Sequence, residues 1–179
     1  MIQVRFTGLG GQGIILMGEI LGEAAVMDKR FVGQTSSYGS EARGSACRAD
    51  VIISDSWIDY PKVTEATVLA CMSQGTYRDN INKVSRSDGT IFFDSQLITP
   101  DPSSPLKHVG VPAVEKAVQE LGSQMVANIV FLGAVVKSAR LASEDSVLKA
   151  LANRVPPSHL ELNRKALSLG FQLGGSTAR

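Results

Sequence analysis

The residues best suited to chemistry form a glycine-rich segment near the start of the chain, Gly8-Leu9-Gly10-Gly11-Gln12-Gly13. The apolar run 2–6 precedes this segment, and the apolar segment 14–21 follows it. That order predicts a strand, a tight turn and the first turn of a helix. Such a turn directs unpaired backbone N–H groups and the positive end of the helix dipole at one point, which favours an anion such as a phosphate. The residues expected to contact a cofactor here are Gly8, Gly10, Gly11, Gln12 and Gly13.

The same glycines match the dinucleotide pattern G-x-G-x-x-G through Gly8, Gly10 and Gly13. That pattern also requires an acidic residue about 20 residues later, at the end of the second strand, to bind a ribose hydroxyl. The second predicted strand, 30–35, leads into a segment without a carboxylate, and Asp28 lies at its opposite end. The sequence therefore argues against NAD. From the motif alone, a bound anion and close packing of a helix on a strand both stay open.

Composition sets the broad class of the protein. A chain of 179 residues, 44% hydrophobic and 20% charged, predicts one globular domain spanning residues 1–179. A net charge of +1 and an aromatic content of 6% argue against a nucleic-acid partner. Cys47 and Cys71 are expected to be buried thiols, too few to ligate an iron–sulfur cluster, and His108 and His159 suggest no metal site. The sequence shows neither a signal peptide nor a membrane-spanning run, so we expect a cytoplasmic protein with no membrane contact.

Apolar runs that alternate with helical patterns predict an α/β fold. We expect three layers, α/β/α, with a largely parallel, Rossmann-like sheet and a helical C-terminal third. Strands are predicted at 2–6, 31–35, 46–54, 67–72, 90–94 and 108–111. Helices are predicted at 14–21, 77–84, 113–121, 126–141, 144–154 and 159–169, the last ending at Gly170. Met17 and Met125 are expected in the core.

A second group of candidate site residues follows the second strand. Its members are Ser37, Tyr38, Gly39, Glu41, Arg43 and Gly44. We expect this loop at the carboxyl ends of the strands, beside the glycine turn, where ligands gather in such sheets. The guanidinium group of Arg43 suits a carboxylate or a phosphate. A solvated surface pair of Glu41 and Arg43 is the alternative.

No catalytic residue is predicted. The chain contains no G-x-S-x-G motif, and neither histidine has a candidate nucleophile near it in the sequence. Asp94 ends a strand, and we interpret it as a cap for the residues that follow. Asn128 lies in an apolar helix, where a buried amide needs hydrogen-bond partners.

Taken together, these motifs resemble the gamma subunit of the 2-oxoacid:ferredoxin oxidoreductases, which is equivalent to the third domain of the single-chain pyruvate enzymes. The resemblance covers nearly the whole chain and rests on segments 8–13, 37–44, 94–95, 127–133 and 163–170. The loop of that family usually reads Ser-Tyr-Gly-Pro-Glu-Met-Arg-Gly-Gly. Here Ser40, Ala42 and Ser45 replace its proline, methionine and last glycine, while its tyrosine, glutamate and arginine are present.

The resemblance implies a part in the oxidative decarboxylation of a 2-oxoacid to an acyl-CoA, with electrons passed to ferredoxin. It implies that thiamine diphosphate and the iron–sulfur clusters are held by partner subunits, thiamine-binding and ferredoxin-like, and that this chain is inactive alone. The glycine turn and the loop from Tyr38 to Arg43 would then help to position coenzyme A. The 2-oxoglutarate type is favoured, and the pyruvate and indolepyruvate types stay open. We expect that the isolated chain can form a homodimer through surfaces that normally meet partners.

Two other functions stay open at this point. One is a stand-alone, Rossmann-like nucleotide-binding oxidoreductase, against which the missing ribose carboxylate counts. The other is a purely structural subunit whose loops serve only for docking.

Overall fold

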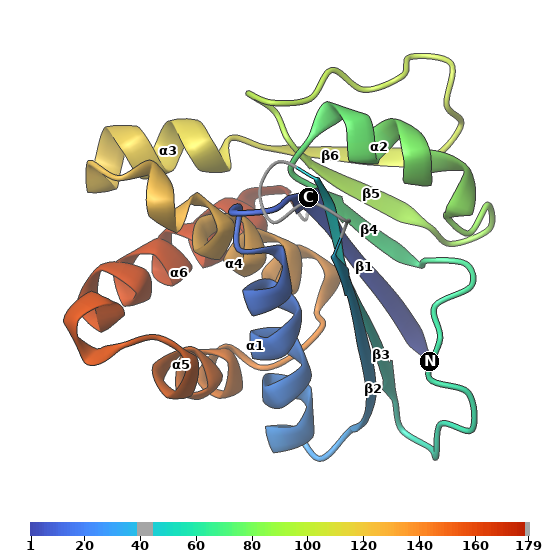
Figure 1. Ribbon diagram of the computed structural model, residues 1–179, viewed down its shortest axis with the longest axis horizontal. Coiled ribbons are helices and arrows are strands. Elements are labelled where there is room, and N and C mark those ends of the chain that lie inside the picture. Colours follow the sequence, from blue (N-terminus) through green and yellow to red (C-terminus); the bar gives the residue numbers. More distant parts are fainter. Residues whose placement is uncertain (39–44, 178–179) are drawn as a thin grey trace.

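The computed structural model describes residues 1–38 and 45–177, and these form one six-stranded sheet in the order β2-β3-β1-β4-β5-β6 (Figure 1). The strands are β1 (Ile2–Leu9), β2 (Phe31–Tyr38), β3 (Ala46–Ser54), β4 (Val68–Cys71), β5 (Thr90–Asp94) and β6 (Lys107–Val111). Neighbours from β1 to β6 are parallel, whereas β3 is antiparallel to both β1 and β2. The predicted α/β fold is confirmed, with a mixed sheet.

The antiparallel pair arises from a short connection. Only residues 39–45 separate β2 from β3. A crossover between parallel strands needs about a dozen residues or more, so a connection of this length returns the chain alongside β2. The strand predicted at 46–54 thus lies between β2 and β1, one position from the sheet edge.

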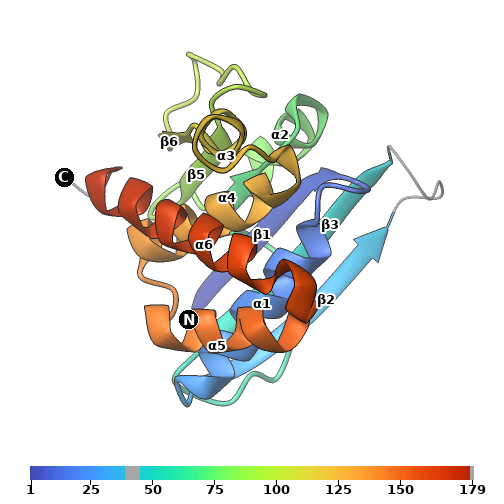
Figure 2. The same ribbon diagram turned by 90° about the vertical axis from the view of Figure 1, so that its left-hand side faces the viewer.

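Most helices gather on one side of the sheet. The helices are α1 (Ile14–Met27), α2 (Gln74–Asn80), α3 (Ala113–Leu121), α4 (Ala127–Ala139), α5 (Glu144–Arg154) and α6 (Pro157–Thr177), with short 3-10 turns at Ile81–Lys83 and Gln124–Val126. Figure 2 views the side that carries α1, α4, α5 and α6. α2 lies on the opposite side, where it packs against β1 and β4. The third layer is therefore thin.

The main core lies between the sheet and this helical side. Alternate residues of β1, Val4 and Phe6, are fully buried against it, whereas Arg5 and Thr7 point to the other face. Met17 is fully buried, as predicted, but the prediction for Met125 is wrong, because its side chain is 87% exposed. Among the described residues, no helix has the length and apolar character needed to cross a membrane.

The last helix does not end at Gly170, as the sequence pattern suggested, but continues to Thr177. A Cβ at Gly170 would overlap the carbonyl oxygen of Val130 and would lie 2.9 Å from Cα of Gly133. This glycine is therefore a point of close approach between α4 and α6 rather than a stop signal.

Candidate ligand cleft

The glycine turn joins β1 to α1 in the way that the sequence predicted. Gly11 and Gly13 have positive φ angles of 95° and 72°, a region that residues with a Cβ rarely occupy. Gly13 is the N-cap of α1; no side chain caps this end, and no acidic residue lies in the first turn. The first backbone N–H groups of α1 and the positive end of its dipole thus remain available to an anion.

The side chain of Gln12 fixes this turn to the neighbouring strand. Its Oε1 accepts a hydrogen bond from the backbone N–H of Leu9 at 2.7 Å, and its Nε2 donates to the carbonyl of Met72 at 2.9 Å. The N–H of Gly10 also donates to the carbonyl of Ser45, just before β3. The amide of Gln12 therefore holds the turn in place.

A cleft of about 500 Å³ opens beside the turn. It lies where α1 and α2 leave the adjacent strands β1 and β4 toward opposite sides of the sheet, which is the usual ligand position in open α/β folds. Its lining comprises Gly11, Gln12, Gly13, Leu16, Met72, Leu97, Val114, Gln124, Met125, Ala127, Asn128 and Asn163. Within the described part of the chain, this lining combines carboxamides with apolar side chains and contains no charged residue.

Helices α4 and α6 each contribute one asparagine to the cleft lining, Asn128 and Asn163. Asn128 is 7% exposed, and its Nδ2 lies 3.5 Å from the carbonyl oxygen of Gly13, a weak donor contact. Asn163 donates from Nδ2 to the carbonyl of His159 at 2.8 Å. Among the described residues neither side-chain oxygen accepts a hydrogen bond, so both are free to accept one from a ligand.

Asp94 supports one wall of the cleft without lining it. Its fully buried carboxylate accepts hydrogen bonds from the N–H groups of Gln96 at 2.9 Å, Leu97 at 3.2 Å and Val114 at 2.9 Å. Burial raises the pKa of Asp94, and these N–H donors act in the opposite direction. The interpretation of Asp94 as a cap is confirmed: it positions Leu97 and Val114, which form part of the apolar wall.

Of the second predicted group, the structure describes Ser37 and Tyr38, which lie at the same end of the strands as the glycine turn. Strand register aligns Tyr38 with Cys47 and Cys47 with Gly8, which places Tyr38 two strands, or roughly 10 Å, from the glycine turn. Ser37 and Tyr38 are exposed at the end of β2 and do not line the cleft. The predicted site residues Gly39, Glu41, Arg43 and Gly44 lie outside the described residues.

Of the lining residues, sequence reasoning predicted only Gly11, Gln12 and Gly13 as ligand contacts, and it missed the others, among them Gln124, Met125 and Asn163. Met125 was assigned to the core, and Asn163 entered only through the family resemblance. The exposure of Met125 beside the apolar residues of the cleft marks it as a candidate ligand contact, and this exposure is known only from the folded structure. Asn163 reaches the cleft because α6 packs along α4, a contact that no local pattern encodes.

The two thiols are buried and unpaired, as predicted. Cys71 accepts a hydrogen bond from the hydroxyl of Thr7 at 3.3 Å, and burial raises its pKa to about 12. Within residues 1–38 and 45–177, no three His, Cys, Asp or Glu side chains come together as a set of metal ligands.

Comparison with known proteins places this geometry in context. The sequence pattern described as "Pyruvate ferredoxin/flavodoxin oxidoreductase" matches residues 3–173. The 2-oxoglutarate synthase subunit KorC of Methanocaldococcus jannaschii is 39% identical over 96% of this chain and 92% of its own length. The pyruvate synthase subunit PorC of the same organism is 28% identical over 96% of both chains.

Two solved structures share the fold. The gamma subunit of a keto/oxoacid ferredoxin oxidoreductase from Geobacter sulfurreducens superposes with a TM-score of 0.85 at 35% identity, over 98% of this chain and 99% of that one. A 2-oxoglutarate:ferredoxin oxidoreductase from Magnetococcus marinus, solved with 2-oxoglutarate, coenzyme A and succinyl-CoA bound, gives a TM-score of 0.88 at 20% identity. That match covers 98% of this chain but only 31% of the longer one.

Proposed function

Because the chain belongs to the pyruvate ferredoxin/flavodoxin oxidoreductase family and is a subunit of a 2-oxoacid:ferredoxin oxidoreductase, we propose that its enzyme acts on 2-oxoglutarate. One observation carries this choice. Within a single organism, M. jannaschii, the chain is 39% identical to the 2-oxoglutarate subunit and 28% identical to the pyruvate subunit. In this reaction the bond to the carboxylate carbon breaks and CO₂ leaves. Two electrons pass to ferredoxin, the thiol of coenzyme A loses its proton, and the succinyl group is transferred to the sulfur.

We propose that the cleft receives part of coenzyme A. The pantetheine arm of this substrate carries amide groups on an otherwise apolar chain. The cleft offers complementary chemistry, because its lining combines the side-chain amides of Asn128 and Asn163 with the apolar residues Leu97 and Val114. The diphosphate would lie toward the uncapped N-terminus of α1, where backbone N–H groups favour negative charge. Tyr38 and Arg43 are proposed contacts for the phosphates.

Thiamine diphosphate and the iron–sulfur clusters are proposed to lie in partner subunits, one thiamine-binding and one ferredoxin-like. The described residues fit neither group: the cleft lining has no carboxylate to hold a metal-bound diphosphate, and the two thiols are buried on β3 and β4. The chain would therefore support a reaction whose electron transfer takes place elsewhere in the complex.

The substrate assignment is tested with the assembled enzyme. The complete complex is purified without oxygen and assayed for coenzyme A-dependent reduction of a viologen dye with 2-oxoglutarate, pyruvate, 2-oxoisovalerate and indolepyruvate in turn. We expect the largest kcat/KM with 2-oxoglutarate. A larger value with pyruvate would contradict the assignment of substrate and leave the subunit role intact.

The coenzyme A contact is tested in the same complex with Asn128→Ala and Asn163→Ala. Loss of a ligand hydrogen bond should raise the KM for coenzyme A roughly 5- to 10-fold for each variant, with the KM for 2-oxoglutarate unchanged. Asn82→Ala is the matched control, because Asn82 is exposed and lies outside the cleft.

Arg43→Ala tests whether Arg43 contacts coenzyme A or serves only in docking to a partner subunit. Normal assembly with a raised coenzyme A KM supports contact, whereas failed assembly supports a docking role alone.

A further inference from the structure

Among the described residues, no helix lies on the outer face of β2 and β3, and this part of the sheet carries charged and polar side chains. Strand register places Thr35, Asp50 and Arg5 in one row across this face, and Ser37, Arg48 and Thr7 in the next. α2 lies over β1 and β4 instead. Among the described residues, the loop that follows β3 provides the remaining cover of β2 and β3 on this side.

A hollow of about 640 Å³ lies on this face, and we term it the basic hollow. Its lining comprises Arg5, Thr35, Ser36, Arg48, Asp50, Tyr60, Pro61, Lys62, Val63, Thr64 and Lys83. Its floor is a buried ion pair. Arg5 donates from Nε to Oδ1 of Asp50 at 2.8 Å and from Nη2 to Oδ2 at 2.9 Å, and the same Nη2 donates to the carbonyl of Val63 at 3.0 Å. Both carboxylate oxygens of Asp50 are thus engaged by Arg5.

The rim of the basic hollow has an excess of positive charge. The Nε of Arg48 lies 3.6 Å from Oδ2 of Asp50, and the Arg48 side chain is 43% exposed. Within residues 1–38 and 45–177, Lys62 and Lys83 form no ion pair, and both are exposed. Among the described residues of the lining, Asp50 is the only carboxylate. Asp59 and Glu65 are close to lining residues in the sequence but do not line the hollow. Carboxylates from another molecule would complement this rim.

Exposed aromatic side chains lie on the same outer face: Tyr60 lines the basic hollow, and Trp57 packs on Phe31, four residues before Thr35 on β2. Tyr60 is 65% exposed. Trp57, the one tryptophan of the chain, is 74% exposed and packs edge-on against Phe31, with ring centroids 6.0 Å apart. Trp, Tyr and Arg are the residue types that dominate the energetics of protein–protein interfaces. This composition favours a protein partner over a small anion.

We propose that the basic hollow, together with Trp57 and Tyr60, docks a carboxylate-rich surface of a larger subunit of the same oxidoreductase. The proposal rests on the proposed function. The same fold makes up 31% of the longer M. marinus chain, where it is covalently joined to further sequence. A separate chain needs a non-covalent interface in place of that connection. The charge of the rim selects an acidic partner, and the aromatic side chains supply the apolar contact.

Charge reversal tests the docking surface. The wild-type chain is titrated against the remaining subunits of the enzyme, and its dissociation constant is measured at low and high NaCl concentration. Lys62→Glu and Lys83→Glu should each weaken binding about tenfold at low salt, and the difference should shrink at high salt. Trp57→Ala should weaken binding by about tenfold or more at both salt concentrations.

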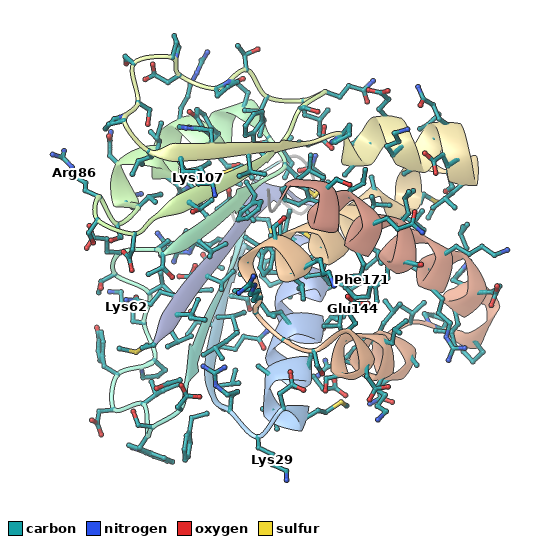
Figure 3. The ribbon with its side chains drawn as sticks, turned by 180° about the vertical axis from the view of Figure 1, so that it is seen from behind. Lys29, Lys62, Arg86, Lys107, Glu144 and Phe171 are labelled. Atoms are coloured by element: carbon teal, nitrogen blue, oxygen red, sulfur yellow. The ribbon has the colours of Figure 1, made fainter. Side chains whose placement is uncertain are left out.

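Lys107→Glu is the matched control for the charge change. Lys107 is also exposed and, among the described residues, without an ion-pair partner, but it lies on β6, at the far edge of the sheet (Figure 3). Its reversal should leave the dissociation constant within about twofold of wild type. All variants should keep the thermal midpoint of the wild-type chain. If Lys62→Glu unfolds, Lys62→Gln replaces it and should retain part of the loss in affinity.

The outcomes separate this inference from the proposed function. If Lys62→Glu and Lys83→Glu bind as tightly as wild type in an enzyme that oxidises 2-oxoglutarate, the docking surface is wrong and the function stands. If the reversals abolish self-association of the chain and leave subunit binding intact, the occupant is a second copy and the proposal is overturned. If the wild-type chain does not assemble with the other subunits, the proposed function fails and this inference fails with it.

Discussion

Gly170→Ala tests whether the contact between α4 and α6 fixes the cleft. A Cβ at this position would overlap the carbonyl oxygen of Val130 and would lie 2.9 Å from Cα of Gly133 and 3.0 Å from the backbone nitrogen of Ala134. All three are backbone atoms, so no side chain can rotate away. Carbon atoms pack best at about 3.5–4.0 Å, and the helices must therefore separate by roughly 1 Å.

The cost follows from two opposing contributions. Overpacking of this kind costs about 1–3 kcal/mol, occasionally more. Alanine regains up to about 1 kcal/mol because it is a better helix former than glycine. We expect a net loss of about 2 kcal/mol, which lowers the thermal midpoint by roughly 4–8 °C in a chain of this length. Because Asn128 and Asn163 lie on the two displaced helices, the KM for coenzyme A of the assembled enzyme should rise as well.

Gly175→Ala supplies a control in the same helix. A Cβ there meets no atom within 4 Å, so only the helix-forming gain remains, and the variant should be up to about 1 kcal/mol more stable than wild type. Both variants are measured by urea and thermal unfolding of the isolated chain, followed by circular dichroism. If Gly170→Ala is as stable as Gly175→Ala, the close approach of α4 and α6 is refuted.

Four further predictions concern Asp94, the two thiols and the glycine turn. Asp94→Ala should lower the free energy of unfolding, measured by urea titration, by about 3 kcal/mol, since three backbone N–H groups lose their acceptor. Because burial raises the pKa of Asp94, its ionisation opposes folding above the folded-state pKa. The stability advantage of wild type over Asp94→Asn should therefore grow as the pH falls through that pKa toward 3.8, and parallel urea midpoints across the pH series would contradict this. Burial also raises the thiol pKa of Cys47 and, to about 12, that of Cys71, so a thiol reagent should modify neither faster than the chain unfolds. Gly13→Ala should cost about 1–2 kcal/mol of stability for its left-handed backbone, and the KM for coenzyme A should rise because the new Cβ displaces the amide of Asn128.

The turn at the start of the chain was predictable because its chemistry is local. Glycines between an apolar strand and an apolar helix permit few conformations, and Gly13 adopts the left-handed one that the motif requires. The end of the last helix was not predictable on the same grounds. Gly170 serves a contact between two helices that lie far apart in the sequence, and local pattern cannot distinguish such a glycine from one that ends a helix.

The cleft was only partly predictable for a related reason. The sequence identified the glycine turn that lines one side of the cleft. It also identified Asn128 as a buried amide that needs a hydrogen-bond partner. The opposite wall depends on Asp94, which orients Leu97 and Val114, and on the packing that brings Asn163 to the same place. Residues 12 and 163 share a cleft only after the whole chain has folded, so spacing carries no information about their contact.

The absence of charge in the described cleft lining bears on why this chain works as a subunit. Coenzyme A carries several negative charges on its phosphates. The N-terminus of α1 offers the equivalent of only about half a positive charge, which stabilises an anion by roughly 0.3–1 kcal/mol at an exposed site. Phosphate binding of useful strength therefore needs cations beyond the lining, from Arg43, from a partner subunit or from both. The isolated chain should then bind coenzyme A weakly. Affinity that rises on assembly, measured by titration of the chain and of the complete enzyme, would show that the partners complete the site.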